Sequence, residues 1–373
     1  MVPRFCSLTA AQALGLLKDN TITVEEYALS LLDRIKERDS IVKAWAYLDP
    51  AFVLGQARTL DQIPHDQRGP LHGLAVGVKD IMNTKDMSTQ FGSPIYQGHQ
   101  AGFDSSAVAI LRAAGSLIFG KTTTTEFAVA NSGPETANPH DPNRTPGSSS
   151  CRSAAAIADL QVPLSLGAQT GGSIIRPASF TVVFAMKPTF NAIPLEGQTV
   201  FAPTFVTFGF FAHSIEDLQL LANVFALRDD KPPEDTPLGV NVEEASFPSG
   251  VADAKTLERI QKVIILGEAQ VSFLKEYQVG KAELAEGIRD IVENTSNISH
   301  KEWMEASDTA VDEAPLGLGD MGSATFNTMW MGFHMPVINI SLEAPRFCDQ
   351  LLLRTSKVLS ETLMAQGSWE GRL

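Results

Sequence analysis

Apolar residues recur every three or four positions after Thr23, and this spacing predicts an amphipathic helix. Thr23 with Glu26, and Thr9 with Gln12, have the spacing of a capping box, in which each side chain bonds the other residue's backbone N–H. The pattern therefore predicts two helices near the start of the chain. The buried face of the second helix consists of Val24, Tyr27, Ala28, Leu31, Leu32 and Ile35.

Continuous apolar runs alternate with helical ones in the next part of the chain. Residues 71–78 are apolar with two glycines and predict a strand that delivers Lys79 at its end. A helix over residues 105–114, capped by Asp104, and a short strand over residues 116–119 follow. The alternation of strand, helix and strand predicts an α/β fold with helices on the faces of a sheet.

The composition changes to Gly, Pro, Asn and Ser from residue 131 to residue 153. Such a long polar loop inside an apolar protein is usually functional or disordered. A helix is predicted to begin at Ala154, and a brief strand over residues 164–166 leads into a glycine pair. Later helices are predicted over residues 215–226, after a cap at Ser214, and over residues 282–293 and 349–364.

Composition and charge narrow the class of protein. The 373 residues are 44% hydrophobic and 19% charged, which is typical of a globular chain. A formal net charge of −14 disfavours nucleic acid as a partner, because binding to phosphates depends on Lys and Arg. No apolar run approaches the ~18 residues of a membrane span, and the first 21 residues do not resemble a signal peptide.

The cysteines and histidines show no pattern of a structural or metal site. Three widely spaced cysteines, Cys6, Cys151 and Cys348, favour a reducing, cytoplasmic location rather than a disulfide framework. The seven histidines lack ligand spacing such as His-Glu-x-x-His. We therefore expect no metal and no cofactor.

Three short motifs carry the candidate chemistry. They are residues 77–80 (Gly-Val-Lys-Asp), residues 146–153 (Pro-Gly-Ser-Ser-Ser-Cys-Arg-Ser) and residues 169–173 (Gln-Thr-Gly-Gly-Ser). Cleavage of an amide through an acyl-enzyme needs a hydroxyl nucleophile, a base for its proton and N–H donors for the developing oxyanion. The motifs contain residue types for all three tasks without a histidine.

In their order and spacing these motifs resemble those of the amidase signature family. The resemblance runs from about Ser7 to Ala226 and implies a large mixed β-sheet flanked by α-helices. On this basis we expect a single amidase-like domain over residues 1–373. It would comprise an N-terminal helical segment (1–70), the signature core (71–226) and a variable, shortened C-terminal part (227–373).

The resemblance also implies a role for individual residues. Ser173 would be the acylated nucleophile, Ser149 the bridging serine preceded by a cis peptide bond, and Lys79 the terminal base. The oxyanion would be bound by the backbone N–H groups of Thr170, Gly171, Gly172 and Ser173. The implied activity is that of a hydrolase of non-peptide C–N bonds, with a small-molecule amide as substrate. The protein could form a homodimer.

Lys79 can serve as a base only if its surroundings depress its pKa. A free lysine amine has a pKa of ~10.4, and burial or a nearby cation lowers it. Asp80 would have the opposite effect if it paired with Lys79. In an extended segment, successive side chains point to opposite faces, which predicts that the Asp80 carboxylate lies away from the amine.

Several departures from the family pattern leave rival functions open. Ser148 and Arg152 occupy positions where glycine is usual, and arginine there would be strained at φ > 0 or crowd the pocket. A strand that usually follows residues 336–340 is missing. These departures favour, as an alternative, a weakly active or inactive amidase-like binding protein. A further alternative is an amidotransferase A-type subunit that releases ammonia from glutamine.

Other features have competing interpretations. Residues 115–122 match the pattern of a nucleotide-binding P-loop, but their middle predicts a strand where a phosphate cradle requires a loop. Arg176 is predicted to fix a loop rather than bind substrate. A run of phenylalanines either packs in the core or lines an acyl channel, and consists of Phe201, Phe205, Phe208, Phe210 and Phe211.

Overall fold

The computed structural model describes residues 5–129, 136–230, 254–312, 325–329, 339–343 and 346–365. Within these ranges an eight-stranded sheet forms the centre of the molecule, with strand order β1-β3-β2-β4-β6-β5-β7-β8. The strands are β1 (Trp45–Tyr47), β2 (Ala75–Lys79), β3 (Leu117–Thr122), β4 (Leu164–Gln169), β5 (Phe184–Lys187), β6 (Thr207–Ala212), β7 (Thr325–Met329) and β8 (Asn339–Glu343).

The sheet is mixed, as predicted. Strand β2 is parallel to both β3 and β4, whereas every other adjacent pair is antiparallel. Strand β8 lies at one edge, and all the strands between β1 and β8 are paired on both sides. The described strands therefore form one sheet without a break.

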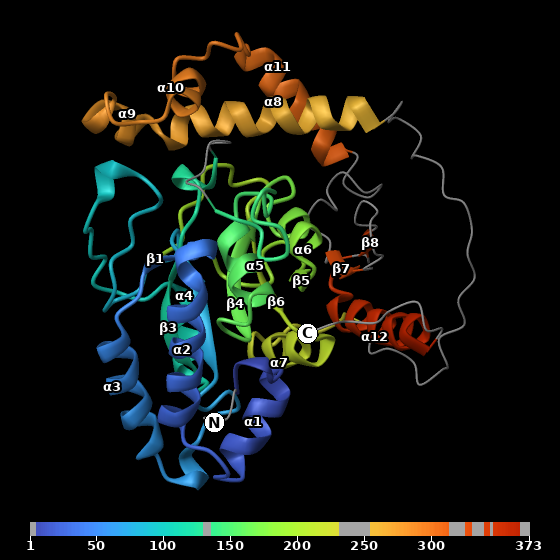
Figure 1. The fold of residues 1–373 in the computed structure, drawn as a ribbon. Helices are drawn as coiled ribbons and strands as arrows, with labels where there is room; N and C mark the ends of the chain where they lie inside the picture. The colour runs from blue at the N-terminus through green and yellow to red at the C-terminus, as the bar shows by residue number, and fades with distance from the viewer. Residues whose placement is uncertain are drawn as a thin grey trace.

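Helices surround this sheet (Figure 1). The first seven are α1 (Ala10–Lys18), α2 (Val24–Val42), α3 (Pro50–Asp61), α4 (Ser106–Ala113), α5 (Cys151–Ala158), α6 (Ile175–Thr181) and α7 (Ile215–Val224). The later ones are α8 (Ala254–Ser272), α9 (Leu274–Gly280), α10 (Glu286–Val292), α11 (His300–Asp312) and α12 (Asp349–Ala365). Short 3-10 helices are η1 (Phe5–Ser7), η2 (His65–Gln67), η3 (Pro94–Tyr96) and η4 (Glu126–Ala128).

The predicted helix starts are partly confirmed. Both capping boxes are formed, at Thr9 before α1 and at Thr23 before α2. The prediction that Asp104 caps α4 is wrong, because the helix begins after Ser105. The Asp104 carboxylate instead accepts a hydrogen bond from the Lys85 backbone N–H at 2.9 Å and faces Arg112 at 3.2 Å. The charged contact with the Arg112 guanidinium therefore takes the place of hydrogen bonds from the first N–H groups of α4 to Asp104.

Helices α5 and α7 lie on opposite faces of the sheet. Phe210 and Phe211 are successive residues of β6, so their side chains point to opposite faces. Phe210 stacks with Phe225 at the end of α7, and Phe211 lies beside Gly167 on the face where Ser150 begins α5. All five phenylalanines of the 201–211 run are buried in apolar clusters, which supports core packing.

Helices α8 to α11 form a layer across one end of the sheet (Figure 1). Two apolar clusters attach them to the body. Ala269, Phe273, Leu284 and Ile288 pack with Phe127, Phe201, Ala202 and Val206, and Ile260, Ile264 and Ala306 pack with Phe205. The sequence periodicity did not predict α8 or α11, although Gln261 of α8 contacts the turn that contains Thr170.

Candidate active site

The candidate site lies where two parallel strands end. Lys79 is the last residue of β2 and Gln169 the last residue of β4, and these strands are neighbours in the sheet. The carboxyl ends of parallel strands meet at the same edge of a sheet, where ligands commonly bind. The first and third sequence motifs are therefore brought together by the sheet itself.

Lys79 is completely buried and bonded to two serines. Its Nζ donates to Ser149 Oγ at 2.8 Å and to Ser150 Oγ at 2.9 Å. Burial lowers the pKa of Lys79 to about 7, and the nearby Cys151 thiol partly opposes this shift. A substantial fraction of the amine is therefore neutral near pH 7, which is the state that a base requires.

The Asp80 carboxylate does not pair with Lys79. It lies 3.2 Å from Lys121 Nζ and accepts a hydrogen bond from the Gln90 backbone N–H. Lys121 belongs to β3, next to Thr122, whose hydroxyl bonds Ser153 on the α5 side of the sheet. The alternation predicted from the sequence is confirmed, since Lys79 and Asp80 point to opposite faces.

The serine-rich loop reaches Lys79 through a short, constrained segment. The peptide bond between Ser148 and Ser149 is cis. Gly147 has φ +85°, and a Cβ there would lie 3.0 Å from Pro177 Cα, so a side chain would meet both strain and a clash. Arg176 donates to the Ser148 carbonyl at 2.9 Å, which is the loop-fixing role that the sequence predicted.

The residues expected to form the oxyanion hole make up the turn between β4 and α6. Gln169 Oε1 accepts hydrogen bonds from Ile174 N at 3.0 Å and Ile175 N at 3.1 Å, and so caps the start of α6. Among the described residues, no acceptor bonds the N–H groups of Gly171, Gly172 and Ser173. Unpaired N–H groups at a helix start are suited to an anionic oxygen.

Ser173 contacts the serine-rich loop through its main-chain carbonyl. The Ser150 N–H donates to the Ser173 carbonyl at 3.3 Å, and the Ser173 side chain is half-buried. Within the part of the chain that the structure describes, the Ser173 hydroxyl makes no hydrogen bond. The structure thus brings Lys79 and Ser149 into direct contact and places Ser173 against the same loop.

Two further residues belong to this arrangement and were not singled out from the sequence. Ser150 contacts the amine as closely as Ser149 does, and its hydroxyl also donates to the Ala168 carbonyl at 3.2 Å. Lys121 holds the Asp80 carboxylate. A run of three serines does not indicate which hydroxyls face Lys79. Lys121 stands out in the sequence only as part of a P-loop pattern, which the strand β3 excludes.

The expectation that Arg152 strains the loop or crowds the pocket is wrong. Arg152 lies in the first turn of α5 with helical geometry rather than positive φ. Its guanidinium is buried and donates to the Lys43 carbonyl at 3.2 Å, at the C-terminal end of α2. The side chain is therefore held at the C-terminal end of α2.

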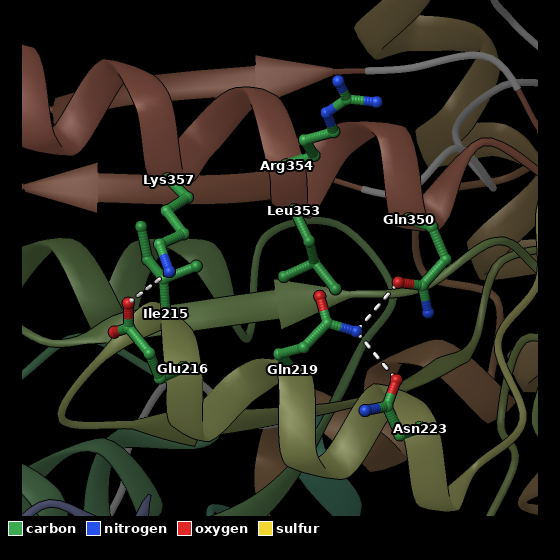
Figure 2. Close-up of a pocket in the computed structure, with 8 residues that line it drawn as sticks. All are labelled: Ile215, Glu216, Gln219, Asn223, Gln350, Leu353, Arg354 and Lys357. Atoms are coloured by element: carbon green, nitrogen blue, oxygen red, sulfur yellow. Dashed lines mark hydrogen bonds and ion pairs between the residues drawn. The ribbon is translucent and has the colours of Figure 1, made fainter. Parts of the chain in front are cut away.

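A separate cleft of about 460 Å³ lies between α7 and α12 (Figure 2). Several of its polar groups pair with one another: Glu216 pairs with Lys357 at 3.2 Å, and Gln219 Nε2 donates to Asn223 and Gln350. None of the candidate catalytic residues lines it.

The described residues contain neither a metal cluster nor a membrane-spanning helix. Across these ranges, no three His, Cys, Asp or Glu side chains gather as a metal would require. No described helix combines the length and apolar composition needed to cross a bilayer.

Comparison with known sequences identifies the family. A family model described as Amidase matches residues 26–263. The glutamyl-tRNA(Gln) amidotransferase A-subunit of Natranaerobius thermophilus is 36% identical over 220 residues, covering 57% of this chain and 45% of that protein. The protein of the same name from Lysinibacillus sphaericus is 31% identical over 297 residues, covering 78% and 60%. The chain thus spans about half the length of these curated relatives.

Solved structures share the fold. A crystal structure of an amidase superposes with a TM-score of 0.84 at 21% identity, covering 95% of this chain and 100% of that one. The native peptide amidase of Stenotrophomonas maltophilia gives a TM-score of 0.79 at 19% identity, covering 97% and 98%. At such identities the agreement concerns the fold alone.

Proposed function

This chain belongs to the amidase signature family, whose members are hydrolases of C–N bonds, and on that premise we propose that it hydrolyses a small carboxamide through a serine acyl-enzyme. Ser173 is the nucleophile, Ser149 the relay and Lys79 the terminal base. The observation that carries this proposal is the 2.8 Å contact from Lys79 Nζ to Ser149 Oγ, made by a buried amine whose pKa is lowered to about 7.

Acylation begins with the neutral Lys79 amine. Ser173 Oγ forms a bond to the amide carbonyl carbon while its proton passes to Ser149 Oγ, and the Ser149 proton passes to Lys79 Nζ. A hydroxyl can relay in this way because it both donates and accepts. The reaction needs the Ser149 and Ser173 hydroxyls to come into hydrogen-bond range, and such contacts often tighten only when substrate binds.

The carbonyl oxygen becomes an oxyanion during this step. The N–H groups of the turn from Thr170 to Ser173 stabilise it, each such donor being worth ~10²–10³ in rate. Collapse of the tetrahedral intermediate breaks the C–N bond, and the proton on Lys79 returns through Ser149 to the leaving nitrogen. Water then attacks the acyl-enzyme by the same proton route, which releases the acid and restores Ser173. No cofactor enters either step.

A second candidate is an ammonia-releasing subunit of an amidotransferase. The curated relatives carry that name, with 31–36% identity in the two cited. In that case the substrate amide is the side chain of glutamine, and partner subunits consume the ammonia. The chemistry at Ser173 is the same, so the two candidates differ in substrate and partner rather than in mechanism. With Arg152 bonded to Lys43, the inactive binding protein loses one of the two observations that favoured it, and the strand expected but missing after residues 336–340 remains as the other.

Replacement of Ser173 by Ala tests the shared mechanism. We expect the variant to lose both hydrolysis of simple alkyl and aryl amides and covalent labelling by a fluorophosphonate, while Ser148→Ala, in the neighbouring loop, keeps both. Unchanged labelling of Ser173→Ala would show that another group is the nucleophile. Ammonia release from glutamine by the chain alone, compared with its turnover of simple amides, separates the two candidates.

We propose a cytoplasmic protein without nucleic-acid or membrane partners, and a homodimer is one arrangement that sedimentation can test.

A further inference from the structure

We infer that Gln261 of α8 is a positioning residue for the oxyanion hole. Its side-chain amide Nε2 donates to the Thr170 carbonyl at 3.4 Å. The same nitrogen would lie 3.6 Å from a Cβ on Gly171, which places it directly against the turn. This inference rests on the proposed function and extends it to a helix outside the three sequence motifs.

One peptide unit links Gln261 to the oxyanion hole. The carbonyl of Thr170 and the N–H of Gly171 belong to the same planar, trans peptide group, so they point in opposite directions. A donor that fixes the carbonyl therefore also fixes the direction of the Gly171 N–H. That N–H has no acceptor among the described residues, which leaves it available to the oxygen of a bound substrate.

The turn itself has little to hold this peptide in place. Gly171 and Gly172 carry no side chains, and Gly172 has φ +152°, with no atom within 4 Å of where its Cβ would be. Glycine loses more conformational freedom on ordering than other residues. Gln169 fixes the following residues, Ile174 and Ile175, rather than the Thr170–Gly171 peptide. Gln261 supplies the contact that this peptide otherwise lacks.

Helix α8 is well suited to present such a side chain. Ile260 and Ile264 flank Gln261 and are buried against Phe205 in the body of the protein. Further along the helix, the Glu268 carboxylate accepts hydrogen bonds from the Thr204 N–H and hydroxyl. Gln261 therefore projects from an element that is fixed on both sides of it, which is what precise positioning requires.

A matched pair of substitutions on α8 tests the inference. Gln261→Met keeps the length of the side chain and removes the donor. Gln270→Met makes the same change nine residues further along, where the glutamine makes no hydrogen bond among the described residues. The measurements are kcat and KM for a simple aryl amide, the rate of fluorophosphonate labelling, and the affinity for an aryl boronic acid, whose adduct with a serine is a tetrahedral anion.

We expect Gln261→Met to lower kcat and the boronic acid affinity by a similar factor of about ten, with KM unchanged. This loss is smaller than the ~10²–10³ for removing a donor, because the Gly171 N–H remains but is free to turn. Gln261→Glu should lose more, since an ionised carboxylate cannot donate and repels the oxyanion. Gln270→Met should behave like the wild type.

Two results would overturn the inference, and they are distinguishable. In the first, the wild type is labelled and active, but Gln261→Met keeps the kcat and the boronic acid affinity of the wild type. A variant in which only KM rises or only the thermal stability falls counts as the same result. Gln261 then does not position the donor. If the wild type is not labelled by the fluorophosphonate at all, the proposed function fails and this inference fails with it.

Discussion

The carboxylate of Asp80 lies 3.2 Å from Lys121 Nζ, on the face of the sheet opposite to the Lys79 amine. Lys121 is itself buried and also donates to the Met82 carbonyl at 2.8 Å and to Thr89 Oγ1 at 2.6 Å. The acid next to the proposed base in sequence is therefore neutralised by another lysine. This arrangement leaves Lys79 without an anionic partner among the described residues.

Loss of Lys121 should destabilise the protein strongly. In Lys121→Met the Asp80 carboxylate stays buried without its cation, and removing one partner of a buried ion pair typically costs about 3–5 kcal/mol. Chemical denaturation at pH 7 measures the effect. The double variant Asp80→Asn, Lys121→Met should recover part of the loss. Lys301→Met, which removes an exposed pair with Glu305, serves as the control and should leave the unfolding free energy nearly unchanged.

The pH dependence of acylation should report the pKa of Lys79. The neutral amine is the active form, so the rate of fluorophosphonate labelling should be high above pH 7 and fall about tenfold per pH unit below it, with a midpoint near the value of about 7. Labelling of the free enzyme between pH 5.5 and 9.5 gives the curve. A midpoint above pH 9 would mean that burial does not shift this lysine.

Ser149 and Ser150 should differ in their importance although both contact Lys79. Ser149→Ala removes the proposed relay and should lower kcat by about 10²–10⁴. Ser150→Ala removes its bond to the Ala168 carbonyl and a bond that orients the amine, and the latter is worth ~0.5–1.5 kcal/mol, so kcat should fall by no more than about tenfold. Steady-state kinetics of the two variants tests this prediction. A larger loss of kcat for Ser150→Ala than for Ser149→Ala would mean that Ser150, rather than Ser149, is the relay.

The sequence predicted those parts of the site that lie close to regular elements. Lys79 could be placed because an apolar strand precedes it, and the opposite direction of Asp80 followed from the alternation of side chains in an extended segment. The three motifs, taken together, indicated the family and its mixed sheet. Each of these inferences depended on local pattern or on spacing along the chain.

What the sequence could not provide depended on long-range contacts. Arg152 suggested a crowded pocket, and only the tertiary structure shows its guanidinium at the Lys43 carbonyl. Gln261 is 88 residues after Ser173, in a helix whose apolar face is divided between two clusters, so no motif connects it with the turn. The positions of both side chains, Arg152 and Gln261, thus depend on tertiary packing.

Asp217 links two helices and should make stability depend on pH. It is fully buried in the first turn of α7, and its Oδ1 accepts a hydrogen bond from the Ala11 N–H at the start of α1 at 2.8 Å. Burial raises the pKa of Asp217 from 3.8 to about 6, which outweighs its hydrogen bonds from Ala10, Ala11 and Ser214. The carboxylate is therefore more costly to ionise in the folded protein than in the unfolded chain.

The sign of the effect follows from linkage. Because the folded pKa is the higher one, protonation of Asp217 stabilises the fold fully below pH 3.8, and this contribution is lost as the pH rises through about 6. Asp217→Asn keeps an oxygen that can accept from Ala11 but never ionises. Relative to the wild type, it should gain up to about 3 kcal/mol of stability between pH 4 and pH 8, as expected for a shift of two pKa units.

Urea denaturation of both proteins across this range measures the difference. Glu216→Gln, which removes the neighbouring exposed acid, has the opposite pKa shift and should not reproduce the gain. Asp217→Ala should be destabilised at every pH, because the Ala11 N–H would be left buried without an acceptor. If the difference between the wild type and Asp217→Asn stays constant from pH 4 to pH 8, the carboxylate is not held neutral at the junction of α1 and α7.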